Sequence, residues 1–238
     1  MTKTQIMTFA DKVITFNKEL NFPETVQLPK NIAIMNPFKD NGKETVKLST
    51  EFYKKYFSDD KKRHLVLGVN PGKNGAGVTG IPFTSPQNLK ESCNIFCEQN
   101  HHEVSGAFIY RMIKQYGTIE DFYSKFFISN VSPLGFVKKT ENGKEVNRNY
   151  YDYIDLMVST TPFIIETLKK QIEFGIRRDK VYCLGNGDNY KYLYNLNKEY
   201  GFFDQVIALP HPRYIAQYKK KLEPEYIDLY LKYLKTTS

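Results

Sequence analysis

An apolar run that stops at Asn70-Pro-Gly72 constrains the fold of this chain more than any other feature. The run, Leu65-Val-Leu-Gly-Val69, shows no alternation of apolar and polar residues, which is typical of a strand buried on both faces in a parallel sheet. In open α/β sheets, ligands bind outside the carboxyl ends of such strands. We therefore expect the chemistry of this protein to begin at Asn70.

Three further runs of this kind follow, and each ends at a polar or turn-forming residue. They are Phe126-Phe-Ile-Ser-Asn130, Val181-Tyr-Cys-Leu-Gly185 and Val206-Ile-Ala-Leu-Pro-His211. Helical patterns cover residues 104–116, 151–174 and 189–200. Strands that alternate with helices predict an α/β fold, here a three-layer α/β/α sandwich around a central four-stranded, mostly parallel sheet.

We expect the four strand ends to point the same way and to meet at one crevice, although they lie far apart in sequence. The residues concerned are Asn70, Asn130, Gly185 and His211. The alternative is that each one marks an ordinary strand-to-helix turn, where Asn, Gly and Pro are common in any case.

The chain is predicted to form a single domain over residues 1–238. Within it, residues 1–60 are expected to be a helical extension packed on an α/β core formed by residues 61–238. The patterns behind this division are helices over 4–20 and 44–57, a Pro-bearing connector over 21–42, and a closing helix over 224–235. The polar stretch 138–145 contains Asn142-Gly143, a pair typical of a projecting hairpin or loop.

Composition restricts the partners and the compartment. The formal charge of +8 favours a polyanionic partner such as nucleic acid, although a lysine excess is often only a solvated surface. No apolar run is long enough to span a membrane. The first residues lack the apolar stretch of a signal peptide, and 3 cysteines cannot form a fully paired set of disulfides. We therefore expect a cytoplasmic protein with reduced thiols.

Two motif matches point to other kinds of protein. Gly75-Ala-Gly77-Val-Thr-Gly80 fits the dinucleotide-binding pattern, but Pro82 follows closely, so the sequence predicts no helix at these glycines and the fingerprint lacks its context. A nucleotide-binding enzyme using this loop remains an alternative. Cys93, Cys97 and the pair His101-His102 have helical spacing that could gather metal ligands on one face, yet no second ligand pair accompanies them. Buried or surface thiols are the alternative there.

Four motifs, taken in order, resemble those of the uracil-DNA glycosylase superfamily, specifically its single-strand-selective monofunctional branch. They are Gly68-Val-Asn-Pro-Gly72, Thr79-Gly-Ile-Pro-Phe83, Asn130-Val-Ser-Pro-Leu134 and His211-Pro-Arg213. The resemblance implies a base-excision repair enzyme that hydrolyses the N-glycosidic bond of uracil or a related damaged base with water as nucleophile. It implies single-stranded DNA as a partner, with duplex DNA as a further expectation, and neither cofactor nor metal. A non-catalytic protein that binds single strands through the same pocket is the alternative.

The resemblance also implies a role for each position. Asn70 would hold the attacking water, since an amide can position a nucleophile but cannot ionise it, and His211 would hydrogen-bond the O2 atom of the departing base. Phe83 would stack on the flipped base and Asn130 would read its edge. The remaining residues are Gly68, Pro71 and Gly72 for substrate binding, and Lys73, Arg213, Tyr214, Lys219, Lys220 and Lys221 for DNA binding.

The last motif departs from the family pattern. The branch usually has Ser-Pro-Arg after its His-Pro, whereas Arg213 here follows Pro212 directly. This places in question the wedge that fills the gap left by a flipped nucleotide, and with it the efficiency on duplex DNA. The iron–sulfur members of the superfamily need four cysteines, and the 3 of this chain exclude that branch.

Overall fold

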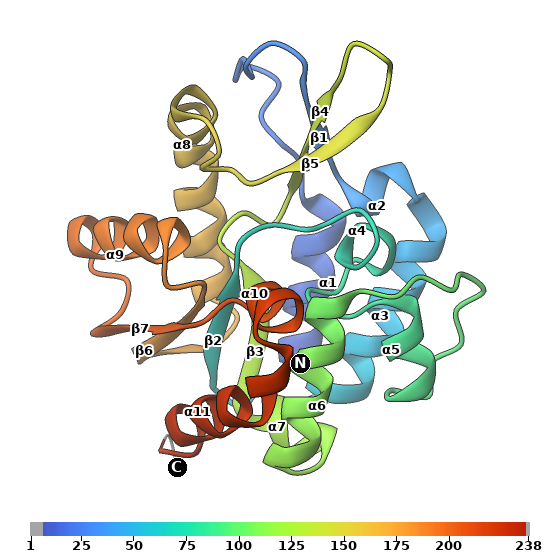
Figure 1. Cartoon of the computed structure of the whole chain (residues 1–238), viewed down its shortest axis with the longest axis vertical. Helices are drawn as coiled ribbons and strands as arrows, with labels where there is room; N and C mark the ends of the chain where they lie inside the picture. Colours follow the sequence, from blue (N-terminus) through green and yellow to red (C-terminus); the bar gives the residue numbers. More distant parts are fainter. Residues whose placement is uncertain (1–6, 237–238) are drawn as a thin grey trace, which may run out of the picture.

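The computed structural model describes residues 7–236, and a sheet of four parallel strands lies at its centre (Figure 1). The strand order is β3-β2-β6-β7, and each neighbouring pair is parallel. The strands are β2 (Arg63–Gly68), β3 (Phe126–Asn130), β6 (Ile176–Leu184) and β7 (Gln205–Leu209). The predicted α/β class and the four strands of the central sheet are confirmed.

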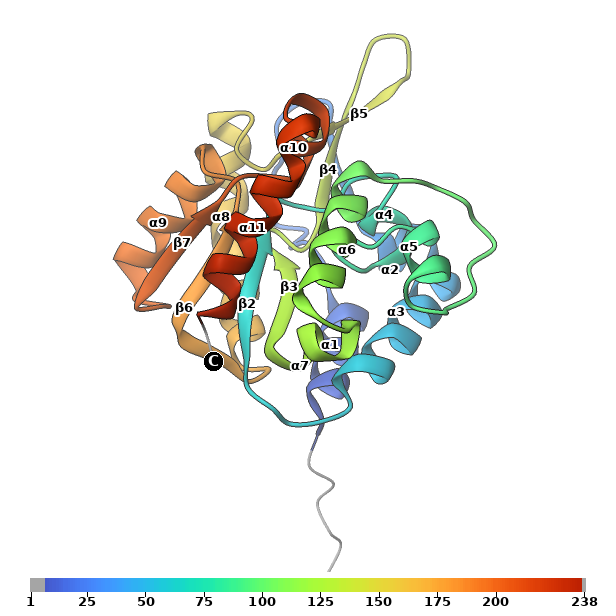
Figure 2. The ribbon, with the colours of Figure 1, turned by 60° about the horizontal axis from the view of Figure 1, so that its bottom comes forward.

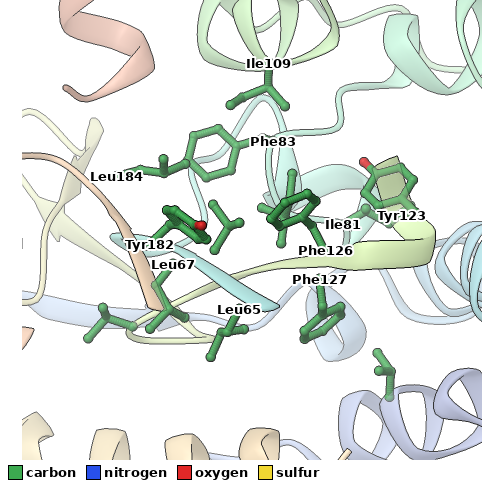
Figure 3. Close-up of a cluster of buried hydrophobic side chains, with 14 of the residues drawn as sticks. Leu65, Leu67, Ile81, Phe83, Ile109, Tyr123, Phe126, Phe127, Tyr182 and Leu184 are labelled. Atoms are coloured by element: carbon green, nitrogen blue, oxygen red, sulfur yellow. The ribbon is translucent and has the colours of Figure 1, made fainter. Parts of the chain in front are cut away.

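Helices cover both faces of this sheet and complete the three predicted layers. Helices α1 (Phe9–Glu19) and α8 (Ile154–Ile172) lie on one face, and α6 (Val104–Tyr116) and α11 (Glu223–Lys235) lie on the other (Figures 1 and 2). In Figure 3, Phe126 and Phe127 are adjacent in β3, yet their rings point to opposite faces of the sheet, so one strand contributes side chains to both helical layers. Because β2 lies between β3 and β6 under helices on both sides, all of its residues are buried, Arg63 and His64 included. The apolar run predicted this burial from Leu65 onward.

The remaining helices are short or lie at the edges of the sheet. They are α2 (Pro37–Asp40), α3 (Gly42–Phe57), α4 (Ala76–Thr79), α5 (Pro86–Glu91), α7 (Ile119–Lys125), α9 (Asp188–Tyr200), α10 (Pro212–Tyr218) and the 3-10 turn η1 (Lys220–Leu222). Capping boxes begin α1, α5 and α7, at Thr8, Ser85 and Thr118. The long helices lie within a few residues of their predicted bounds, although the first residues expected in α1, 4–6, lie outside the described residues.

A second sheet stands beside the first. Its order is β1-β4-β5, all antiparallel, with β1 (Ile32–Met35), β4 (Gly135–Lys139) and β5 (Glu145–Arg148). The hairpin expected around Asn142-Gly143 is confirmed, and it projects from the body of the molecule (Figure 2). The prediction for residues 21–42 was incomplete, because this connector supplies β1. None of the helices within residues 7–236 is both long and apolar enough to cross a bilayer.

Candidate active site

The carboxyl ends of β2, β3 and β7 open into one cavity of about 300 Å³. Of the four strand-end residues expected at a common crevice, Asn70, Asn130 and His211 line it and Gly185 does not. Phe83, which the family resemblance assigned to the base, lines it too. Pro71, Gly72, Lys73 and Arg213 line it as well. Gly185 lies behind this wall, since a Cβ atom built on it would be 3.8 Å from the His211 ring.

Asn70 is held by the main chain at the end of β5 and just after it. Its Nδ2 donates to the carbonyl oxygen of Arg148 at 3.1 Å, and its Oδ1 accepts from the backbone N–H of Tyr150 at 3.1 Å. These two bonds determine which way the amide faces, because a carbonyl needs a donor and an N–H needs an acceptor. An amide oxygen carries two lone pairs, so Oδ1 can accept one further hydrogen bond.

A close approach of two strand ends shapes the base of the cavity. Gly68 is the last residue of β2 and pairs in register with Asn130, the last residue of β3. A Cβ atom on Gly68 would lie 2.5 Å from Asn130 Oδ1 and 2.5 Å from Phe83 Cε2, so only glycine fits. Phe83 has a φ of 55°, a strained conformation for a residue with a side chain, of the kind that gathers at ligand sites. Its ring centroid is 6.1 Å from that of His211.

His211 is the N-cap of α10, and its Nδ1 accepts the backbone N–H of Arg213 at 3.1 Å. An accepting Nδ1 places the ring proton on Nε2 in the neutral imidazole. Burial, followed by the positive charge of Arg213, lowers the pKa of His211 to about 4. The ring is therefore neutral at physiological pH, with Nε2–H as a hydrogen-bond donor.

The predicted DNA-binding residues divide between the cavity and its rim. Lys73 lines the cavity and pairs with Glu145 of β5 at 3.1 Å. Arg213 also lines it, whereas Tyr214 is 44% exposed on α10 outside the lining. Lys219, Lys220 and Lys221 follow at the end of α10 and in η1, also outside the lining. The structure thus brings two of these side chains to the cavity and leaves the others on the adjoining surface.

Glu103 is a cavity residue that the sequence did not predict. It is the N-cap of α6, and its Oε2 would lie 2.7 Å from a Cβ atom built on Gly75. Burial raises the pKa of the Glu103 carboxyl. A carboxylate just before an apolar helical run was the available signal, but it indicates a helix start as readily as a cavity. The sequence analysis also missed the residues at the end of β5 and just after it, Asn147, Arg148 and Asn149, which line the cavity. No pattern in their neighbouring residues indicates that they lie near the end of β2.

Neither the dinucleotide-binding pattern nor the Cys/His pattern adopts the local structure that its function requires. The expectation of no helix in the Gly75–Gly80 loop was wrong, because α4 forms one turn there and ends at Gly80 with a φ of 70°. One turn is far shorter than the helix of a dinucleotide fingerprint. Residues 92–103 form no helix, so the helical spacing of Cys93 and Cys97 places no ligands on a common face. In residues 7–236 no group of three or more His, Cys, Asp or Glu is arranged to hold a metal ion.

Comparisons with known proteins place the chain in one family. A family model described as the uracil DNA glycosylase superfamily matches residues 55–235. Among solved structures 11 chains match, including the crystal structure of wild-type SMUG2 from Pedobacter heparinus. That chain is 47% identical over 97% of this chain and 98% of its own length, with a TM-score of 0.94. No curated protein matches the sequence at a significant level.

Proposed function

Because this chain belongs to the uracil DNA glycosylase superfamily, we propose that its cavity receives a uracil extruded from DNA and that Asn70 and His211 catalyse its release. The chain is a DNA glycosylase, a hydrolase of base-excision repair, and it resembles the single-strand-selective branch. The observation that carries the residue roles is the meeting of Asn70, Phe83, Asn130 and His211 around one cavity.

In the proposed reaction the bond between C1′ of the sugar and N1 of uracil breaks, and its electron pair leaves with the base. Negative charge then grows on N1 and O2 of the departing uracil. The Nε2–H group of neutral His211 donates to O2 and stabilises this charge. A neutral donor suits the task, because it needs no proton from solvent and gives none to the product.

Asn70 serves the nucleophile in this proposal. The free lone pair of its Oδ1 accepts a hydrogen bond from water and holds that water for attack on C1′. The amide takes no proton, so its contribution is placement of the water. The proton that the water loses once its oxygen has bonded to C1′ passes through solvent to the uracil anion, which leaves as neutral uracil. The two bonds from Asn70 to the main chain at Arg148 and Tyr150 support this role, because they keep the amide in one orientation.

The base itself is held by Phe83 and Asn130. Stacking on an aromatic ring contributes about 1–3 kcal/mol per base in nucleic-acid sites, and the Asn130 amide offers a donor and an acceptor for O4 and N3 of uracil. Reaching this cavity requires the nucleotide to leave the helix stack, which costs least in single-stranded DNA. We therefore include base flipping and a preference for single strands in the proposal.

The surface beside the cavity supports contacts to phosphate. Arg213 lies at the first turn of α10, and the half-buried Lys219 and the exposed Lys220 and Lys221 follow at its other end. Tyr214 is exposed on the same helix, with its ring centroid 5.8 Å from that of Tyr218. Basic groups of this kind fix the register of a strand without reading its sequence. We propose that α10 lies along the DNA backbone.

Excision on defined oligonucleotides tests the proposal. Excess protein is incubated with labelled single strands or duplexes that carry one uracil, and alkali then cleaves abasic sites. We expect cleavage at uracil, faster in single strands, with none when cytosine replaces uracil and no loss on adding a chelator. Binding to the uracil strand without any cleavage would instead identify a non-catalytic base-binding protein.

We also propose a cytoplasmic location. The thiols of Cys93, Cys97 and Cys183 are free and buried, which fits a reducing compartment. Detection of the protein in fractionated cells tests this, and recovery from an exported fraction would contradict it.

A further inference from the structure

A fully buried tyrosine stands directly behind the residue that holds the nucleophile. Tyr150 lies between β5 and α8 and is 0% exposed. Its backbone N–H donates to Asn70 Oδ1, and two residues earlier the carbonyl of Arg148 accepts from Asn70 Nδ2. The position of the segment 148–150 therefore sets the position of the Asn70 amide.

The other end of Tyr150 is anchored behind His211. Its hydroxyl donates to Asn189 Oδ1 at 2.8 Å, and Asn189 Nδ2 donates to the carbonyl of Leu184, the last residue of β6, at 3.1 Å. The next residue is Gly185, where an added Cβ would contact Asn189 at 3.5 Å and the His211 ring at 3.8 Å. One side chain thus connects the strand end that carries Asn70 to the wall that carries His211.

We propose that Tyr150 is a positioning residue for catalysis, whose hydroxyl bond to Asn189 holds the segment 148–150 in place and so orients the Asn70 amide toward the attacking water. This inference rests on the proposed role of Asn70. Small displacements matter in such a role, since a misplacement of about 1 Å can lower a catalysed rate about 100-fold. Burial also raises the pKa of Tyr150, so the hydroxyl stays protonated and donates throughout the working range of pH.

The ring of Tyr150 has packing partners that are independent of its hydroxyl. Its centroid lies 4.9 Å from that of Tyr151 and 4.8 Å from that of Tyr192, both edge to face. Aromatic pairs of this geometry are favourable by themselves. Tyr150→Phe therefore keeps the ring in its place and removes only the bond to Asn189, which makes it the appropriate test variant.

The test compares single-turnover excision of uracil and affinity for uracil-free single strands. Tyr150→Phe should lower the excision rate about 10-fold or more and leave the affinity unchanged. In an Asn70→Ala background the same change should cost nothing further, because the amide that it orients is gone. In an Asn130→Ala background the full factor should persist. Tyr182→Phe is the matched control, since its buried hydroxyl donates to the Tyr233 carbonyl, away from the cavity.

Each outcome separates this inference from the proposed function. If the wild-type protein releases no uracil, the proposed function fails and takes the inference with it. If the wild type is active and Tyr150→Phe matches its rate, only the positioning role is overturned. An equal loss in the Asn70→Ala background would also overturn it, because the effect would then not pass through Asn70.

Discussion

His211 has two separable tasks, and one pair of substitutions distinguishes them. Nδ1 caps α10 by accepting the Arg213 N–H, while Nε2–H is the donor proposed for the leaving base. His211→Ala removes both. His211→Asn keeps the cap, because an Asn side-chain oxygen is among the strongest N-cap acceptors, but its shorter amide does not reach the position of Nε2. The asparagine variant should therefore be folded but should excise uracil far more slowly than the wild type.

The magnitudes follow from the two bonds. Removing one donor to a developing oxyanion costs about 10²–10³-fold in rate, or about 2.7–4 kcal/mol, and both variants should show this loss. Losing the cap costs about 0.5–2 kcal/mol, and in a protein of this size each kcal/mol lowers Tm by about 2–4 °C. His211→Ala should thus melt about 1–8 °C lower, whereas His211→Asn should melt close to wild type.

The pH dependence of the excision rate and of thermal stability tests the protonation state of His211 independently of these substitutions. With a pKa of about 4, His211 is neutral over the usual assay range, so the wild-type rate should stay level on acidification until the pH approaches that value. Since the unfolded state takes up this proton near pH 6.5, the stability due to His211 should fall between pH 6.5 and about 4. Single-turnover excision and thermal melting measure both. A wild-type rate in His211→Asn, or a rate that rises as pH falls through 6.5, would refute the reasoning.

Three further predictions concern the cavity and its rim. Gly68→Ala should abolish most of the excision activity, because the added Cβ would collide with the Phe83 ring. Gly72→Ala should keep the activity, because the nearest atom to its added Cβ is 3.8 Å away. Equal excision rates for the two variants would contradict this prediction. Burial raises the pKa of Glu103, so ionisation of this carboxyl lowers the stability of the folded protein as pH rises through the raised pKa. Glu103→Gln should therefore melt at a higher temperature than the wild type at pH 8 and no higher at about pH 4. Identical melting curves at both values of pH would contradict this. Charge reversal of lysines 219–221 should flatten the salt dependence of single-strand affinity, and an unchanged slope would mean that they make no phosphate contacts.

Local patterns were sufficient for the central sheet and its long helices. The run over residues 65–69 is apolar at every position, which is typical of a strand covered on both faces, and the structure places residues 65–68 in β2, between two other strands. Residues 104–116 form α6 with the predicted bounds, because a helical period repeated over three turns is unambiguous. Because ligands bind at the carboxyl ends of such strands, the sequence predicted that Asn70, Asn130 and His211 meet at one site, and all three line one cavity.

The tertiary structure alone decided what surrounds those strand ends. The four residues of β1 carry no distinctive pattern, and they become a strand only because β4, about a hundred residues later, pairs with them. The main chain at Tyr150, which holds Asn70, is 80 residues away from it in the sequence. Glu103, which lines the same cavity, comes from the start of α6. Period and turn chemistry report on neighbours within a few residues, whereas these contacts exist only after the chain has closed on itself. The sequence could therefore predict which residues reach the cavity from the ends of β2, β3 and β7, but not what holds them in position.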